Sequence, residues 1–379
     1  MAILHWGMVG GGDGAFIGDV HRMAARLDGG YQLVAGCFSS DFEITKASAK
    51  LLGVQDDRAY SDFRTMAEVE SQRKDGVSVV SIVTPNFLHY DNVAAFLNVG
   101  IAVICEKPLT VSLLQAQELQ ALAKKRNTFL AVTYNYVENP MVKVARELVK
   151  KGELGELLMV DAYYLQDWLA ADIENSDQKQ AAWRTDPTKA GRAGCLGDIA
   201  IHAYNLVSYL IGYPASSVNA RLATFVVGRR VDDHADIQLS YSENILQGRV
   251  LASQVMTGHE NDLGFRLTGR KATIEWRQED PNVLWFKPMA APAQRLTRNG
   301  AGYPERLNAL CRIPAGHPEG YLEAFANVYK HIRLALSEKD FVYYPNVDQA
   351  VKDMAFVEAC LQSHHQGNWY EVEAVFNNQ

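Results

Sequence analysis

A lysine that directly follows an apolar stretch has a position suited to chemistry. Residues 103–105, at the end of an apolar run, predict a strand buried on both faces, and Glu106, Lys107 and Pro108 come immediately after it. Because Pro108 cannot continue a hydrogen-bonded ladder, the charged pair is expected at the carboxyl end of the strand. Ligands of open α/β sheets bind at that edge, so Lys107 is a candidate catalytic residue and Glu106 a candidate cofactor contact. A solvated lysine is the better interpretation of an isolated Glu-Lys-Pro tripeptide, so the context decides.

Asp198 and His202 form a second candidate pair. They are four residues apart in the helical pattern of residues 197–211, which predicts that both side chains project from one face. A carboxylate in that position can orient an imidazole or balance its charge, as acid–base catalysis requires. Considered alone, such a pair is more often a satisfied contact within a helix.

A glycine-rich turn near the N-terminus predicts a dinucleotide site. Residues 3–9 predict an apolar strand, and a glycine-rich segment ending at Gly18 leads from it into a helix. Strand, turn and helix together bring backbone N–H groups and a helix N-terminus to a pyrophosphate, although a plain turn is the alternative. Gly18 comes three residues later than the usual third glycine, which predicts a longer loop. The expected cofactor contacts here are Gly10, Gly12, Asp13, Ala15, Phe16 and Ile17.

The second predicted strand, residues 31–38, ends where the adenine ribose would lie. Ser39, Ser40 and Asp41 follow it. An acidic residue directly at the strand end is typical of NAD and a neighbouring arginine of NADP, and the chain has neither. Ser39 and Ser40 can bond a ribose hydroxyl or a 2′-phosphate, but the loop offers no cation to pair with a phosphate. The sequence therefore favours NAD and does not exclude NADP.

Strands and helices alternate through the first 130 residues. The strand predicted over residues 77–83 ends in Thr84, Pro85 and Asn86, and His89 follows in the next helix. Such alternation predicts a doubly wound parallel α/β sheet whose strand ends meet at one edge. Thr84, Pro85 and Asn86 are therefore candidate cofactor contacts, and His89 either contacts the cofactor or packs within the protein.

Length, charge and cysteine content limit the remaining possibilities. A chain of 379 residues favours two domains, and a formal charge of −7 argues against a nucleic-acid partner. No apolar run reaches the length of a membrane span and the N-terminus resembles no export signal, so we expect a soluble cytoplasmic protein. The odd number of cysteines, none closely paired, suggests reduced core thiols and neither a disulfide nor a metal site.

The second half of the chain has a different pattern. After a strand predicted over residues 157–168 and the helix of residues 197–211, the remaining segments alternate as strands without intervening helices, which predicts a largely antiparallel sheet in an α+β domain. These strands are predicted over residues 218–227, 235–242, 247–256, 265–269, 272–276 and 283–286. We place the domains at residues 1–133 and 134–379. An exposed sheet face would favour a homodimer or homotetramer packed through this sheet. Residues 290–318 predict a long excursion, and two helices, residues 319–336 and 348–364, close the chain.

Several motifs in order make the chain resemble the Gfo/Idh/MocA family, the group of glucose-fructose oxidoreductase and inositol dehydrogenase. They are the glycine loop with Gly18 and His21, then TPNFLH, CEKPL and YNYVENP, and then the helix with Asp198 and His202. The resemblance covers nearly the whole length. It implies an N-terminal Rossmann domain and a C-terminal domain whose open sheet commonly forms an oligomer interface.

The resemblance also implies roles for individual residues. His202 would be the general base in hydride transfer from a secondary hydroxyl of a sugar or cyclic polyol to nicotinamide, with Lys107 holding the oxygen and Asp198 orienting the pair. Tyr136, in the YNYVENP motif, would contact the substrate. Apart from the resemblance, Trp183 and Arg184 lie just upstream of the helix, where Arg184 could hydrogen-bond sugar hydroxyls and Trp183 could supply a stacking face, although a loop clamp explains these two residues equally well.

Departures from the family pattern lie on the substrate side. Residues 191–194 are Gly-Arg-Ala-Gly instead of a glycine run, Ala200 stands near His202 instead of glycine, and Val137 replaces an arginine. They leave open whether the substrate is neutral or acidic, because Arg184 and Arg192 could serve a carboxylate. Two other functions stay open, namely a glycoside hydrolase that uses NAD transiently and a non-catalytic cofactor-binding protein.

Overall fold

The computed structural model describes residues 3–176, 178–241, 245–338, 341–343 and 345–376. These residues form two compact units. The first unit comprises residues 1–133 and 325–351, and the second comprises residues 134–324 and 352–379. The sequence-based division at residue 133 remains a prediction about independent domains.

The first unit is built on a five-stranded, wholly parallel sheet with the strand order β2-β1-β3-β4-β5. All residues of β3 and β4 are buried, which explains the uninterrupted apolar runs of these strands. This is the doubly wound fold that the alternating pattern predicts. The strands are β1 (Leu4–Gly10), β2 (Tyr31–Cys37), β3 (Val79–Val83), β4 (Ala102–Cys105) and β5 (Leu130–Val132).

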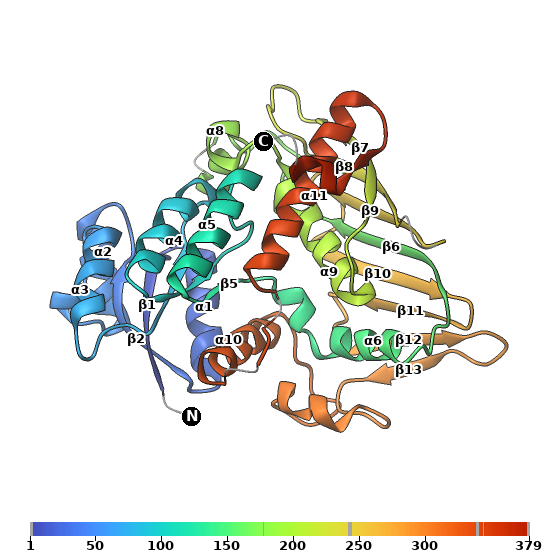
Figure 1. The fold of residues 1–379 in the computed structure, drawn as a ribbon, viewed down its shortest axis with the longest axis horizontal. Coiled ribbons are helices and arrows are strands. Elements are labelled where there is room, and N and C mark those ends of the chain that lie inside the picture. The colour runs from blue at the N-terminus through green and yellow to red at the C-terminus, as the bar shows by residue number, and fades with distance from the viewer. Residues whose placement is uncertain (1–2, 177, 242–244, 339–340, 344, 377–379) are drawn as a thin grey trace. The chain divides into compact units, whose positions relative to one another are not determined.

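Helices connect these strands, and several begin at side-chain caps. Asp41, Asp62 and Ser112 each accept a hydrogen bond from a backbone N–H in the first turn of the helix that follows. Figure 1 shows α3, α4 and α5 side by side. The bounds are α1 (Phe16–Leu27), α2 (Phe42–Leu52), α3 (Phe63–Gln72), α4 (His89–Asn98) and α5 (Leu113–Arg126), with short 3₁₀ turns η1 (Asp56–Arg58) and η2 (Asn86–Leu88).

The second unit is built on a nine-stranded sheet with the order β13-β12-β11-β10-β6-β9-β8-β7-β14. Only the pair β6 and β9 is parallel among the described pairings, so the mainly antiparallel prediction is confirmed. The strands are β6 (Leu157–Leu165), β7 (Ser217–Ala223), β8 (His234–Ser240), β9 (Gln247–Ser253), β10 (Asp262–Gly269), β11 (Ala272–Arg277), β12 (Val283–Pro288), β13 (Gln294–Thr297) and β14 (Tyr370–Glu371).

One face of this sheet is covered by helices α6 (Pro140–Lys150) and α9 (Ile201–Ile211) (Figure 1). Nearly every residue of α9 is buried, which explains why its sequence is apolar on all sides. The other helices of the chain are α7 (Lys179–Arg184), α8 (Pro187–Ala190), α10 (Tyr321–Ser337) and α11 (Val347–Gln366), with the short helices η3 (Asn135–Glu138), η4 (Leu196–Ala200), η5 (Glu305–Leu310) and η6 (Val372–Phe376).

The opposite face of the nine-stranded sheet carries cross-strand ion pairs. Their N–O distances are 2.5–2.9 Å, and the exposed apolar side chains Met159 and Trp285 lie among them. This face is thus more polar than the sequence prediction of a bare sheet implied. The pairs are Arg249–Asp236, Arg266–Glu275, Lys287–Glu275 and Arg277–Asp262.

Several element ends differ from the sequence predictions. The strand predicted over residues 218–227 ends at Ala223, because the Asp233 carboxylate draws the chain away by accepting from the N–H groups of Phe225 and Val226. The excursion of residues 290–318 contains strand β13, and buried Arg298 ties it down through the carbonyls of Ile313 and His317. The predicted end of β8 at Ser242 lies outside the described residues.

Among the described residues, no helix is both long and apolar enough to cross a membrane. Over the same residues no cluster of three or more histidine, cysteine, aspartate or glutamate side chains could hold a metal ion. All five cysteines are free thiols.

Candidate active site

The glycine-rich turn in the first unit requires glycine at particular positions. Gly10, Gly11 and Gly14 have φ values of 81°, 70° and 76°, a region that other residues rarely adopt. A Cβ on Gly18 would lie 2.5 Å from the Gly11 Cα, so only glycine lets α1 approach the turn this closely. Gly18 therefore has the packing role of a third glycine in spite of its late position.

The turn is anchored on both sides. Gly12 N–H donates to the Phe38 carbonyl (3.1 Å), and Asp13 N–H donates to Ser48 Oγ (3.1 Å). Arg22, which the sequence analysis missed, is buried and donates to the Gly11 carbonyl (2.5 Å). The cap residue of α1, Ala15, makes no side-chain cap, which suits an N-terminus that binds a phosphate.

The loop after β2 is held by local hydrogen bonds. Ser39 N–H donates to Thr45 Oγ1 (3.0 Å), and Ser39 Oγ accepts from Asp41 N–H (3.1 Å). The Asp41 carboxylate caps α2 by accepting from Glu43 N–H (2.9 Å). Ser40 is exposed at this turn. The backbone geometry expected to meet the ribose is therefore set before any cofactor arrives.

His89 lies at the ends of β3 and β4. Its Nε2 is 2.8 Å from the Thr84 carbonyl, and its Nδ1 is 3.0 Å from the Pro108 carbonyl. Burial lowers the pKa of His89, while the two carbonyl contacts act in the opposite direction. These two carbonyl contacts hold the His89 ring within the protein, and the contact between His89 and the cofactor stays a prediction. Thr84 Oγ1 also accepts a hydrogen bond from Asn92 Nδ2. Pro85 and Asn86 begin the short 3₁₀ turn η2, which leads from Thr84 to His89.

Glu106 is buried and its two carboxylate oxygens have separate partners. Oε1 lies 2.9 Å from His21 Nε2 and accepts from Thr133 Oγ1, and Oε2 accepts from the Lys107 N–H (3.2 Å). Burial acts to raise the pKa of Glu106, while the hydrogen bonds from His21 and Thr133 and the charge of Lys107 act to lower it, and the net direction is a lowered pKa. Glu106 is therefore a buried carboxylate directly beside the candidate catalytic lysine.

In the second unit, Asp198 lies in the π-helical turn η4 and His202 in the α-helix that follows. The helix is therefore not regular α-helix at Asp198, and the prediction that both side chains project from one face stays a prediction. Asp198 Oδ2 accepts from Gln254 Nε2 (2.8 Å) and lies 3.5 Å from Arg184 Nε. Such turns are frequent at functional sites.

Three tyrosine rings surround the His202 imidazole. The centroids of Tyr134, Tyr136 and Tyr164 lie 5.7, 5.0 and 6.0 Å from that of His202, and the first two rings meet it edge-on. His202 itself is buried. These contacts fix the plane of the imidazole, which is what a general base needs.

The tyrosine hydroxyls belong to a closed polar ring. Tyr164 donates to Asn261 Oδ1 (2.7 Å), so the 2.6 Å contact between the tyrosine hydroxyls is donated by Tyr136. Asn261 Nδ2 lies 3.5 Å from the Tyr136 hydroxyl and closes the ring. Gln166 also donates to Asn261 (2.8 Å) and accepts from Trp168 (3.2 Å). Except for Tyr136, the sequence analysis missed these residues, because strands far apart in the sequence bring them together.

The two arginines left open by the sequence have acidic partners. The Arg184 guanidinium lies 4.2 Å from the centre of the Trp183 ring and beside Asp198. Arg192 is exposed and forms an ion pair with Glu358. Both cations are thus engaged within the protein.

Asp232 is a further residue that the sequence analysis missed. Its carboxylate accepts from Gly194 N–H and Leu196 N–H, both at 2.7 Å, and so holds the start of the segment that carries Asp198. A Cβ on Gly194 would lie 2.2 Å from the Asp232 carbonyl oxygen, which explains this glycine. No spacing or motif in the sequence points to a cap contributed from more than 30 residues away.

The Asp232 carboxylate should make stability depend on pH. Burial raises its pKa from 3.8 to about 6, against the effect of the two N–H groups. The folded state then binds a proton more tightly than the unfolded chain, so this contribution to stability is lost as pH rises from 4 towards 6. Asparagine does not titrate, so the stability of Asp232→Asn should not fall over this pH range. The difference in free energy of unfolding between Asp232→Asn and the wild type should therefore shift in favour of the variant by up to about 3 kcal/mol as pH rises through it. Urea titrations between pH 4.5 and 7.5 measure it, and parallel pH profiles would contradict it.

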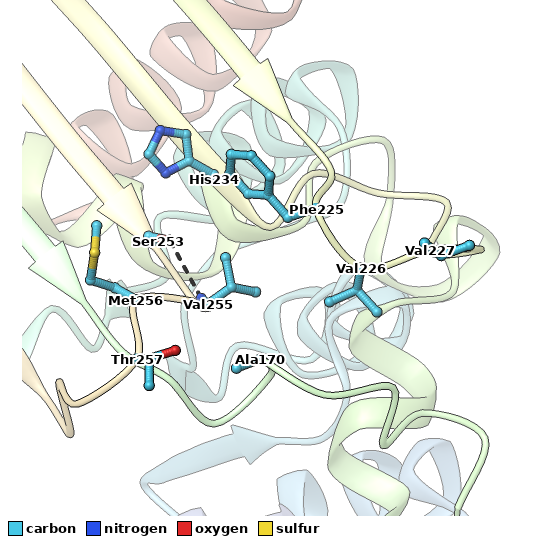
Figure 2. Close-up of a pocket in the computed structure, with 9 residues that line it drawn as sticks. All are labelled: Ala170, Phe225, Val226, Val227, His234, Ser253, Val255, Met256 and Thr257. Carbon is cyan, nitrogen blue, oxygen red and sulfur yellow. Dashed lines mark hydrogen bonds between the residues drawn. The ribbon is translucent and has the colours of Figure 1, made fainter.

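A pocket of about 630 Å³ lies at the ends of β7, β8 and β9 in the second unit. Figure 2 shows the rings of Phe225 and His234 next to each other on one side of it and Val226 and Val227 on the neighbouring loop. No residue predicted for the site lines this mostly apolar pocket, so it is separate from the candidate site residues. The lining residues are Ala170, Phe225, Val226, Val227, His234, Ser253, Val255, Met256 and Thr257.

Comparison with known proteins places the chain in a family. The profile described as "Oxidoreductase family, NAD-binding Rossmann fold" matches residues 4–134, and that of the GFO/IDH/MocA C-terminal domain matches residues 142–275. The chain is 34% identical over 382 residues to the uncharacterized oxidoreductase YfiI of Bacillus subtilis, covering 97% of this chain and 96% of that protein.

Two relatives have more specific descriptions. The crystal structure of an inositol dehydrogenase homolog complexed with NAD+ from Azotobacter vinelandii superposes with a TM-score of 0.94, at 33% identity and 97% coverage of both chains. Levoglucosan dehydrogenase of Pseudarthrobacter phenanthrenivorans is 27% identical over 314 residues, which is 75% of this chain and 76% of that protein. This chain is an NAD-binding oxidoreductase that acts on CH–OH groups and belongs to the GFO/IDH/MocA family.

Proposed function

We propose that the protein is a dehydrogenase that oxidises a secondary hydroxyl of a cyclic polyol or pyranose sugar. His202 takes the hydroxyl proton as general base, Lys107 holds and polarises the same oxygen, and Asp198 orients the pair and balances charge. Bound NAD supplies the hydride acceptor. The cofactor contacts proposed in the first unit are Gly10, Gly12, Asp13, Ala15, Phe16, Ile17, Ser39, Ser40, Thr84, Pro85, Asn86, His89, Glu106 and Lys107.

The observation that carries this proposal is the oriented, buried imidazole of His202. A base that removes a proton while hydride leaves the carbon must be held at a fixed angle to the hydroxyl. The edge-on tyrosines and the closed ring through Asn261 supply that restraint. Tyr136, Trp183 and Arg184 are the further proposed substrate contacts.

The ion pairs of the two arginines support a neutral substrate. Arg184 faces Asp198 and Arg192 faces Glu358, so an anionic sugar would have to compete with a carboxylate for either cation. Related proteins support the same class, since solved structures include an inositol dehydrogenase homolog with NADH and myo-inositol and a levoglucosan dehydrogenase with NADH and levoglucosan.

The test is NADH formation across inositols, aldoses, anhydrosugars and the corresponding sugar acids. We expect kcat/KM for the best neutral compound to exceed that for the best acid by at least about tenfold, the cost of one unpaired charge contact. A sugar acid as the best substrate would contradict the neutral assignment. Sugar release from a glycoside without NADH would instead indicate the hydrolase.

We also propose that the outer face of the nine-stranded sheet packs against a second copy in a homodimer or homotetramer. The charged side chains of this face form ion pairs with one another, and the side chains of Met159 and Trp285 are 60% and 40% exposed. A surface with exposed apolar side chains and few unpaired charges is suited to pack against the same surface of a second copy.

Trp285→Glu should lower the mass in light scattering to that of a smaller assembly, because it places an unpaired charge in the contact. Leu51→Glu, at an exposed position of α2, is the matched control. Equal masses for wild type and Trp285→Glu would contradict this interface.

A further inference from the structure

A continuous chain of buried hydrogen bonds crosses the first unit and ends at Glu106. Trp6 Nε1 lies 2.9 Å from Ser81 Oγ, which lies 2.8 Å from the Tyr329 hydroxyl. That hydroxyl lies 2.6 Å from His21 Nδ1, and His21 Nε2 lies 2.9 Å from Glu106 Oε1. None of the five residues is more than 8% exposed. The free-energy cost of burying these polar groups is offset only if each of them has a hydrogen-bond partner.

The two ends of the chain fix the direction of its first and last bonds. An indole N–H can only donate, and an ionised carboxylate can only accept. In the arrangement that gives every proton an acceptor, Ser81 accepts from Trp6 and donates to Tyr329, which in turn donates to His21 Nδ1. His21 is then a neutral imidazole whose single proton, on Nε2, is donated to Glu106.

The alternative arrangement, in which His21 carries a proton on both ring nitrogens, leaves one proton of the chain without an acceptor. If His21 donated from both nitrogens, Tyr329 would have to donate to Ser81, which already accepts from Trp6. Among the described residues Ser81 side-chain bonds go only to these two groups, so its own proton would have no acceptor. The one-way chain satisfies every proton and is the arrangement we adopt.

Packing prevents the chain from rearranging. The His21 ring meets the rings of Phe325 and Tyr329 edge-on, with centroids 4.9 and 5.7 Å apart. Tyr31 donates to the Tyr329 carbonyl (2.7 Å) and fixes the backbone there. The His21 imidazole therefore has one position and one tautomer.

Glu106 links this chain to the lysine. Its Oε1 accepts a hydrogen bond from His21 Nε2–H, its Oε2 accepts one from the Lys107 N–H, and its charge interacts with that of Lys107. A carboxylate held in this way fixes both the backbone and the electrostatic surroundings of the lysine.

We propose that His21 and Tyr329 are positioning residues for catalysis, which hold Glu106 as an oriented carboxylate beside Lys107. This inference rests on the proposed role of Lys107 in hydride transfer. Neither residue meets substrate or cofactor in this account. Their effect passes through Glu106 to the lysine. Turnover therefore changes much more than cofactor affinity, because the other proposed cofactor contacts are left in place.

Tyr329→Phe tests the inference because it removes one hydroxyl and keeps the ring. We expect kcat to fall about 10- to 100-fold, the size of effect that a slightly misplaced catalytic group produces, while the Kd for NAD changes less than about threefold. Tyr60→Phe is the matched control, since Tyr60 is a buried tyrosine that donates to Glu70 (2.8 Å) in the same unit. Both variants should lose a similar amount of Tm, and only Tyr329→Phe should lose turnover.

Substitutions of His21 give a second, independent comparison. His21→Gln keeps an N–H able to reach Glu106, whereas His21→Leu does not. We expect His21→Gln to retain at least about tenfold more kcat than His21→Leu at comparable Tm. Equal kcat in these two variants, or a Tyr329→Phe kcat equal to that of Tyr60→Phe, would overturn the inference.

The tautomer can be read without any activity. In protein labelled with ¹⁵N-histidine, the His21 ring, assigned by its absence in His21→Gln, should show the neutral Nε2–H form at neutral pH. A doubly protonated ring or the Nδ1–H form would overturn the one-way chain. If this signature is found and His202→Ala still turns over normally, the proposed function fails and the hydrogen-bond chain stands.

Discussion

Replacing His202 by alanine is expected to lower kcat about 10²- to 10⁴-fold, the contribution of a positioned general base. The substitution removes the imidazole that the three tyrosines orient, and no other histidine contacts those rings among the described contacts. The Kd for NAD should stay within about threefold of wild type, because the residues proposed to bind the cofactor lie in the first unit. Steady-state kinetics and equilibrium titration with NAD measure both.

His234→Ala is the matched control for this variant. His234 is a partly buried histidine on β8, its ring contacts Phe225, and it lines the apolar pocket away from the proposed base. It should turn over like the wild type. His202→Ala with near wild-type kcat would refute the assignment of the base.

Replacing Lys107 by methionine is the second large effect that we expect. Methionine keeps most of the side-chain length and removes the charge, so a loss of about 10²-fold or more in kcat would report the ammonium alone. The interaction of Lys107 with Glu106 would be lost at the same time, which leaves a buried carboxylate without that charge. Tm should therefore fall as well.

The control for the lost charge is Lys46→Met. Lys46 is an exposed lysine of α2 whose partner is Glu43, so its removal should change kcat and Tm little. Folded Lys107→Met protein that binds NAD and keeps wild-type turnover would contradict the role of this lysine.

The first unit was largely predictable from the sequence because its signals are local. Fully buried parallel strands give uninterrupted apolar runs such as residues 101–105, and positive φ angles at Gly10 and Gly11 require glycine. The role of Gly18 was harder to predict. Its lateness suggested a longer loop, whereas the structure shows direct packing on Gly11, which depends on the path of the whole turn.

The second unit was less predictable, because contacts distant in sequence build its candidate site. The i, i+4 spacing of Asp198 and His202 predicted a regular helix, and the structure has a π-helical turn there. The Asp232 cap comes from a loop beyond β7 and accounts for how that segment begins. The ring of Tyr136, Tyr164 and Asn261 needs the nine-stranded sheet to be formed first.

His21 shows an intermediate case. The sequence offered it only as part of a motif after the glycine loop, with no chemistry attached. Its partners Tyr329 and Glu106 are 308 and 85 residues away, so no spacing rule could connect them. The fold turns a histidine without a predicted role into the centre of a buried hydrogen-bond chain.

The most direct test of the central claim is transfer of deuterium from substrate to cofactor. The best neutral polyol or sugar would be deuterated at its carbinol carbons and incubated with the enzyme and NAD, and the isolated cofactor would be examined by mass spectrometry. The account predicts reduced cofactor that carries one deuterium per turnover. Substrate turnover without labelled, reduced cofactor would contradict it and indicate chemistry with no net hydride transfer.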